Sequence, residues 1–234
     1  MNQKIVGRGA ARLCLTGTLA ALAACATKPV APPPPAPPPM VLIPPRPLPP
    51  LGAAPNLAVP PLAPDGTRLT INYGVSGGQA LWNLRSAYNV AALSCQKPVH
   101  QPIAAQYAAF LKSNKKLLAT VYKDLDKQFK KEQGADYIRK REIFQTQVYN
   151  YFSLPPVLPA LCDTMLALGP PLGTVPSKEL EARSVLELAR IEKLYLDFFN
   201  SYDQYRTALS AWEARYGAQA TVAPAAIPVA SSTP

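Results

Sequence analysis

The sequence has few groups that could carry out a reaction. Its 234 residues include one histidine and 14 acidic residues, so candidates for acid–base catalysis are scarce. It contains no Cys-x-x-Cys pair, phosphate-binding loop or nucleophile-elbow motif. Asp124 and Asp126 are close in sequence, but helical residues two positions apart point to different faces and cannot act on one substrate. We therefore expect a protein that is not an enzyme and has no catalytic residue, metal site or cofactor.

The apolar run at residues 13–24 is too short to cross a bilayer. It follows the positive charges of Lys4, Arg8 and Arg12, a pattern typical of a secretory signal peptide. The run ends in Leu22-Ala23-Ala24-Cys25, which resembles the lipobox of bacterial lipoproteins.

This resemblance implies that residues 1–24 are removed and that Cys25 receives a diacylglyceryl group and a further acyl chain such as palmitate. Two or more acyl chains hold a protein stably on a membrane. Ala26, in place of an aspartate, implies sorting to the outer membrane of a Gram-negative cell. The alternative is a cleaved soluble protein in which Cys25 is incidental.

Residues 25–65 are expected to form the lipid anchor and a disordered proline-rich linker, since nearly half of residues 29–64 are proline. Proline fixes φ and lacks the amide donor, so the segment favours polyproline II, reaching roughly 110 Å at full extension. We interpret it as a semi-rigid spacer beside the anchor. The alternative is a ligand for an aromatic groove, with residues 40–43 as a docking point.

Cys95 and Cys162 remain after Cys14 and Cys25 are assigned to the signal peptide and the anchor. In an oxidising compartment such a pair predicts a disulfide. It would close a loop of roughly 68 residues and stabilise the fold by roughly 4 kcal/mol. The alternative is a redox or metal-binding thiol, for which His100 is the one histidine available.

Residues 66–217 are expected to fold as an all-α, disulfide-stapled bundle of about five helices, followed by a disordered tail at 218–234. Leu69, Ile71 and Tyr73 alternate with polar residues at its start. This alternation predicts a short strand, which either lies extended against the helices or is an edge open to strand addition by another protein.

Capping signals and apolar periodicity predict the helix boundaries. Ser76 and Gln79 have capping-box spacing and start a first helix that runs toward Cys95. A second helix is expected at about 103–133 and a third at about 136–152.

The fourth predicted helix carries Cys162 and stops at Gly169-Pro170-Pro171. The last is capped by Ser177 and carries an apolar seam of coiled-coil type from Leu188 to Tyr216.

A row of basic residues marks the second and third predicted helices. Between Lys112 and Arg141 the chain has ten basic and four acidic side chains. At 100° per residue, the lysines of the second helix lie within about 60° of its circumference, opposite its apolar side. This row is either a solvated face or an anion- and partner-binding surface. The candidate binding residues are Lys112, Lys116, Lys123, Lys127, Lys130, Arg139 and Arg141.

Removal of the signal peptide lowers the net charge from +10 to +7, so an acidic partner is expected. In the envelope this means peptidoglycan, lipopolysaccharide, anionic lipid or an acidic protein, and not nucleic acid. One alternative is an accessory subunit that uses apolar contacts through the strand or the aromatic seam. Another is an enzyme or small-ligand carrier with buried side chains around Tyr88-Asn89 and Tyr149-Asn150.

The stretches LWNLRSAYNVAALSC (Leu81–Cys95) and VYNYFSLPPVLPALC (Val148–Cys162) are similar to segments of uncharacterised envelope lipoproteins of α-proteobacteria. Each ends at one of the two cysteines expected to pair. The resemblance implies no activity. Together with the lipobox, it leads us to expect an outer-membrane lipoprotein whose helical domain lies in the periplasm.

Replacing Cys25 tests the lipid anchor. We expect the wild type and Cys14→Ala to incorporate labelled palmitate and to fractionate with membranes, because neither lacks the acylated sulfur. Cys25→Ala should incorporate no label. A Cys25→Ala protein that remains labelled and membrane-bound would disprove the anchor.

Overall fold

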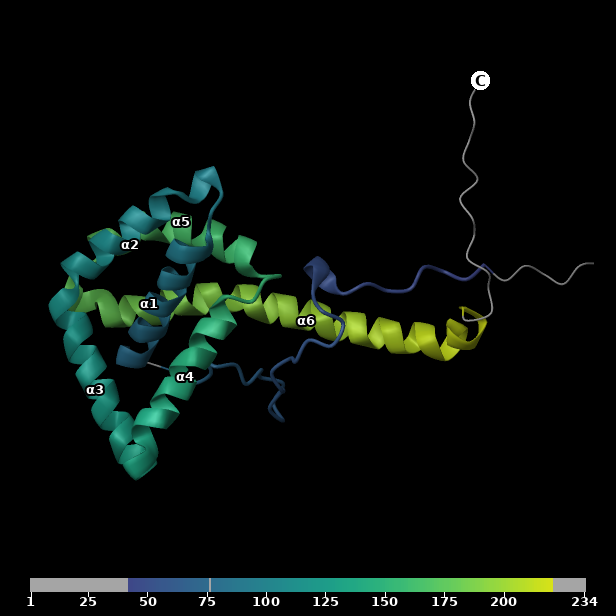
Figure 1. The fold of residues 1–234 in the computed structure, drawn as a ribbon, viewed down its shortest axis with the longest axis horizontal. Helices are drawn as coiled ribbons and strands as arrows, with labels where there is room; N and C mark the ends of the chain where they lie inside the picture. Colours follow the sequence, from purple (N-terminus) through teal and green to yellow (C-terminus); the bar gives the residue numbers. More distant parts are fainter. Residues whose placement is uncertain (1–41, 76, 221–234) are drawn as a thin grey trace, which may run out of the picture. The chain divides into compact units, whose positions relative to one another are not determined.

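The computed structural model describes residues 42–75 and 77–220, which form helices and connecting segments (Figure 1). The α-helices are α1 (Gly77–Ser94), α2 (Pro102–Ser113), α3 (Lys115–Gln133), α4 (Tyr137–Phe152), α5 (Leu158–Thr174) and α6 (Leu180–Ala220). Short 3-10 turns are η1 (Pro50–Gly52), η2 (Pro98–His100), η3 (Gly134–Asp136) and η4 (Ser177–Glu179).

The predicted all-α, disulfide-stapled fold is confirmed: the described residues form no β-strand, and a disulfide joins Cys95 to Cys162. The expected signal peptide, the lipidation site Cys25, linker residues up to 41 and the tail from residue 221 lie outside the described residues.

Helix α1 lies at the centre of the bundle and contacts each of the other five α-helices. Ala80, Ala87 and Ala91 are fully buried on it, together with Leu81 and Leu84. A helix enclosed by several neighbours needs an apolar surface broader than the single stripe of a surface helix. This requirement explains why α1 has buried residues on several of its sides.

The buried amide of Asn83 on α1 belongs to a chain of hydrogen bonds that reaches α6. Asn83 is 0% exposed; its Nδ2 donates to Asn72 Oδ1 at 2.8 Å, and its Oδ1 accepts from Gln79 Nε2 at 2.7 Å. Asn72 Nδ2 donates to Glu192 Oε2 on α6 at 2.7 Å, and Thr70 Oγ1 donates to Glu192 Oε1. This chain of hydrogen bonds fixes residues 70–72 against both α1 and α6.

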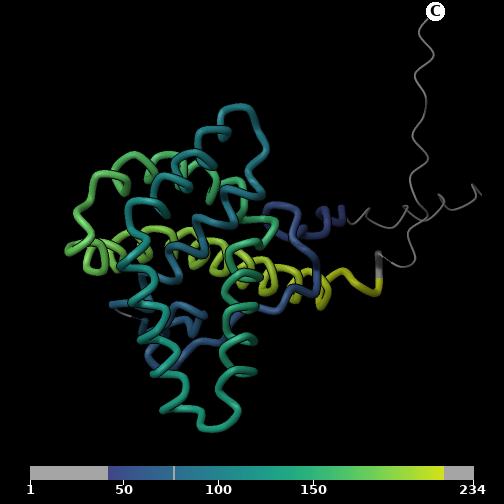
Figure 2. Tube along the Cα trace, turned by 60° about the vertical axis from the view of Figure 1, so that its left-hand side comes forward, coloured from purple at the N-terminus to yellow at the C-terminus, as the bar shows by residue number. Residues whose placement is uncertain are grey.

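The remaining helices pack around α1 as two pairs and the long helix α6. Figures 1 and 2 show α3 and α4 as a hairpin that turns at η3, and α2 beside α5. α6 passes α1 and extends beyond the hairpin, where the segment before α1 lies along it.

The second predicted helix, residues 103–133, is two helices that meet at Asn114. This residue has φ −107° and ψ 16°, its Nδ2 donates to the Phe110 carbonyl at 3.0 Å, and its Oδ1 accepts from Ser177 Oγ at 2.8 Å. An asparagine side chain that bonds to the preceding turn favours a helix end over a helix interior. Ser177 does not cap the last helix as predicted, because it lies inside η4, and α6 begins only at Leu180.

The prediction that the fourth helix stops at Gly169-Pro170-Pro171 is also wrong, since α5 continues to Thr174. Both prolines are exposed near the helix end, where water can satisfy carbonyl groups that lose a donor. Gly169 is buried and serves close packing: a Cβ added there would collide with the Gln106 side chain of α2 and would lie 2.7 Å from Tyr88 Oη of α1. The glycine therefore allows α5 to approach α2 and α1 instead of ending the helix.

The larger of two compact units of the chain begins at Ile43, inside the segment 25–65 that was expected to be a linker and before the expected boundary at residue 66. Proline retains its carbonyl acceptor, and α6 supplies donors: Trp212 Nε1 to the Pro44 carbonyl at 2.7 Å, and Tyr202 Oη to the Ala54 carbonyl at 2.7 Å. Tyr202 Oη also accepts from the Leu57 amide at 3.0 Å. Residues 43–57 are therefore held along α6.

Residues 69–73 do not form the predicted strand. The described segment makes one isolated bridge, between Leu62 and Arg68, and then turns at residues 71–74. Arg68 is buried and donates to Asp203 at 2.6 Å and to Asn200 at 3.1 Å, both on α6. These charge-assisted bonds and the Glu192 contacts compete with strand pairing, so the segment follows the alternative of packing against the helices.

Replacing Asn83 tests its bonds within the core. We expect Asn83→Ala to lower the free energy of unfolding by about 2–3 kcal/mol, because Asn72 and Gln79 each lose a buried partner. Asn150→Ala, an exposed position on α4, should change it by less than about 0.5 kcal/mol. Urea denaturation followed by circular dichroism measures both, and equal effects would contradict the assignment.

Candidate functional site

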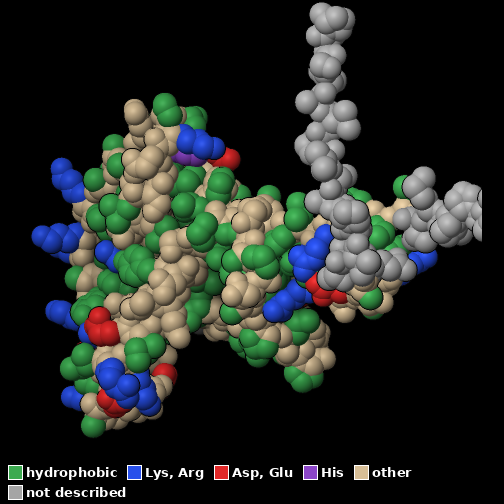
Figure 3. All heavy atoms as spheres, turned by 45° about the vertical axis from the view of Figure 1, so that its right-hand side comes forward, with side chains coloured by type: hydrophobic (Ala, Val, Ile, Leu, Met, Phe, Trp, Pro, Cys, Tyr) green, Lys and Arg blue, Asp and Glu red, His purple; other side chains and the backbone are tan. Residues whose placement is uncertain are grey.

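The helix break divides the predicted lysine row, because Lys112 lies at the end of α2 and the other four lysines lie on α3. All five lysines are exposed. Figure 3 shows Lys and Arg side chains projecting from the edge of the molecule that α2 and α3 form. α3 turns its apolar side inward, with Leu118 and Val121 buried.

Arg141 is a structural residue of the α3–α4 hairpin. Its side chain is 12% exposed and is paired with Asp126 and with Glu142, the latter at 2.9 Å. Its guanidinium lies 5.4 Å from the centre of the Tyr122 ring. The hydrogen bond from Arg141 to Glu142 raises the pKa of the guanidinium further. Arg141 is therefore not available to a ligand.

Three more of the seven candidates have partners within their own helix or hairpin. Lys127 pairs with Asp124 at 2.9 Å, Lys130 lies 6.0 Å from the centre of the Tyr137 ring, and Arg139 pairs with Asp136. The hydrogen bond from Arg139 lowers the pKa of Asp136 below its usual value. These contacts are exposed and individually weak, but they partly compensate the positive charge of Lys127, Lys130 and Arg139.

Lys112, Lys116 and Lys123 have no ion pair or hydrogen bond to a side chain among the residues that the structure describes. The uncompensated positive charge of the predicted row is therefore concentrated at the α2–α3 junction and on the first half of α3.

A groove between α1 and α3 lies next to these lysines, with a volume of about 470 Å³. We call it the basic groove. Its floor is aromatic and aliphatic, with the Trp82 and Tyr122 rings 5.4 Å apart. Arg85 lies over Trp82 at 4.9 Å and donates to Tyr149 Oη at 3.2 Å. The lining residues are Trp82, Arg85, Leu111, Lys115, Leu118, Ala119, Tyr122 and Lys123.

Of the seven predicted residues, Lys123 is the one that lines the basic groove. Lys115, Trp82 and Arg85 line the groove but were not among the predicted residues. The position of Lys115 could have been predicted, because Asn114 before it is a residue that favours helix ends and Lys115 is therefore the first residue of α3. The contribution of Trp82 and Arg85 depends on the packing of α1 against α3 and has no local signal.

In the alternative small-ligand site around Tyr88-Asn89 and Tyr149-Asn150, Tyr107 lies close to Asn89 and Tyr149, and Asn150 lies apart from them. Tyr88 packs in the core, 5.1 Å from Tyr107 and 5.7 Å from Phe110 by ring centres. Asn150 lines a separate open groove of about 600 Å³ that includes Thr70 and Tyr151.

Tyr88 and Tyr151 are held in their neutral form. Burial raises the pKa of Tyr88 to about 12. Burial, together with the nearby Glu192, raises the pKa of Tyr151 far above its usual value. Neither hydroxyl is therefore poised to act as a base near neutral pH.

No family model, curated protein or solved structure matches this chain. Among the described helices, none has the length and apolar character of a membrane span.

Arg139 and Arg141 provide a matched test of the structural assignment. We expect Arg141→Ala to lower the free energy of unfolding by about 1–3 kcal/mol, because Asp126 and Glu142 lose a largely buried partner. Arg139→Ala should leave stability nearly unchanged, since its ion pair is solvated. Thermal unfolding compares the variants, and an unaffected Arg141→Ala would return Arg141 to the list of binding candidates.

Proposed function

We propose that this protein is an outer-membrane lipoprotein, anchored through Cys25, whose helical unit binds an anionic and partly apolar component of the envelope in the basic groove. The observation that carries the proposal is the position of the unpaired lysines: Lys123 lines an aromatic groove, and Lys112 and Lys116 lie on the adjoining helix ends. Periplasmic presentation is supported by the lipobox-like residues 22–25 and by a disulfide, which is typical of oxidising compartments.

The groove combines two kinds of contact. Lys115, Lys123 and Arg85 provide cations, while Trp82 and Tyr122 provide an apolar floor. An anionic lipid or lipopolysaccharide carries phosphate beside acyl chains and can use both. Peptidoglycan carboxylates would use only the cations. The groove therefore favours a lipid-class anion among the expected partners.

The alternative of an accessory subunit has less support from the contacts of the chain. Its aromatic seam is largely buried, with Tyr195 and Tyr202 inaccessible. The strand at 69–73 that was to receive a partner strand does not form. No specific observation favours the enzyme or carrier alternative over binding in the basic groove.

The chain carries a built-in reporter for this proposal. It has two tryptophans. Trp82 lines the groove, whereas Trp212, on α6, donates a hydrogen bond to the Pro44 carbonyl. In a Trp212→Phe background, fluorescence therefore reports on the groove alone. We expect a short-chain phosphatidylglycerol, below its micelle concentration, to change this fluorescence saturably. The matched short-chain phosphatidylcholine should have little effect.

Lysine variants and salt separate binding from adventitious contact. Neutralising Lys112, Lys116 and Lys123 to Gln should weaken phosphatidylglycerol binding at least tenfold, or about 1.4 kcal/mol. Neutralising Lys97, Lys193 and Arg215 to Gln, at exposed positions after α1 and along α6, removes the same charge and should not. Binding should fade as salt shortens the screening length from about 10 Å at 0.1 M to about 3 Å at 1 M. Equal weakening by both triple variants would refute the site.

A further inference from the structure

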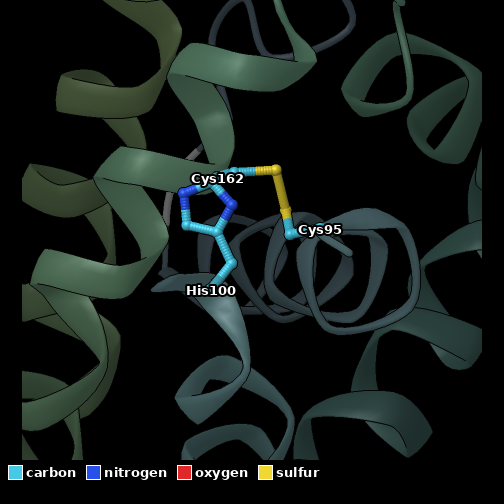
Figure 4. A group of neighbouring side chains, drawn as sticks. All are labelled: Cys95, His100 and Cys162. Atoms are coloured by element: carbon cyan, nitrogen blue, oxygen red, sulfur yellow. A yellow bond between two sulfur atoms is a disulfide. The ribbon is translucent and has the colours of Figure 1, made fainter. Parts of the chain in front are cut away.

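His100, the last residue of η2, is buried beside the disulfide (Figure 4). Its side chain is 2% exposed, and its Nε2 lies 2.7 Å from Asp163 Oδ1. Its Nδ1 is buried and has no hydrogen-bond partner among the described residues. Cys95, His100 and Cys162 each present a ligand atom, and these three atoms lie within 4.8 Å of one another.

Asp163 holds the imidazole in the form that a metal ion requires. A carboxylate accepts the proton of Nε2, so the lone pair of Nδ1 stays free. In Figure 4 the ring nitrogen next to the carbon that joins the ring to the rest of the side chain is Nδ1, and it lies on the side of the two sulfur atoms. The other nitrogen, Nε2, is hydrogen-bonded to Asp163. A histidine ligand whose second nitrogen is bonded to a carboxylate is the usual arrangement in protein metal sites.

We propose that Cys95, Cys162 and His100 form a redox-controlled site for one borderline-soft transition-metal ion, such as Zn²⁺, which binds when the disulfide is reduced. Two thiolates and an imidazole are the ligand types that such ions prefer. The disulfide form offers no thiolate and does not bind. The buried, unpaired Nδ1 thereby acquires a partner that it lacks in the oxidised protein.

The chemistry needs a reductant of the dithiol class. The dithiol gives two electrons and two protons to the S–S bond, which becomes two thiols, while the dithiol itself becomes a disulfide. Binding of the metal ion then releases the two thiol protons to solvent. This site joins the disulfide predicted from the sequence to the alternative given beside it, a redox or metal-binding thiol pair near His100.

Metal binding by the full-length chain tests the proposal. The chain is reduced with dithiothreitol, freed of reductant under argon and dialysed against Zn²⁺, and the bound metal is measured by atomic absorption. We expect one ion per reduced chain and none per oxidised chain. Co²⁺ in place of Zn²⁺ should give a thiolate-to-metal charge-transfer band. Circular dichroism must show that the reduced chain remains helical, since binding that accompanies unfolding would overturn the proposal.

Variants identify the ligands. His100→Gln should abolish tight binding, and Asp163→Ala should weaken it about 10–100-fold while leaving the ligands in place. Asp197→Ala, an exposed acidic residue on α6, is the matched control and should bind as the wild type does. The proposal is wrong if reduced wild-type chain takes up no metal, or if His100→Gln and Asp163→Ala bind it as tightly as the wild type.

Discussion

The fold depends on the burial of α1. Because this helix contacts every other α-helix, the side chain of Asn83 has no access to water and must find partners in the chain. Asn83 finds them in Gln79 and Asn72, and Asn72 passes the connection to Glu192 on α6. One buried amide thus fixes the position of the segment before α1 and orients α1 on α6. The disulfide adds a covalent link from the end of α1 to α5.

Features with local causes could be predicted from the sequence. Apolar periodicity is visible within a few turns of helix, so it predicted α1 and the seam of α6. The disulfide was predicted because two cysteines remain to pair with each other. The asparagine at position 114 is a local signal for a helix end, but its second contact, with Ser177 63 positions away, could not be predicted from the sequence. The ordered course of residues 43–57 depends in the same way on Tyr202 and Trp212, far along the chain.

The candidate site follows the same division. The basic candidate residues were visible as a row in the sequence. Which of them are free to bind a ligand depends on ion pairs such as that of Arg141 with Asp126, which lies 15 positions away on the other arm of the α3–α4 hairpin. The floor of the basic groove comes from α1, so it appears only when α1 packs on α3. Charge could be read from the sequence, whereas the apolar surface beside it required the fold. That combination distinguishes a binding groove from a solvated lysine face.

Photocrosslinking from inside the basic groove shows whether the groove meets its ligand in the cell. Ala119 lines the groove and carries no charge, so a photoreactive residue there leaves every lysine intact. Ala208, exposed on α6, is the control position. We predict a discrete anionic lipid-class product from position 119, absent from position 208 and lost when Lys112, Lys116 and Lys123 are neutralised. The same products from both positions, or none from position 119, would contradict the account.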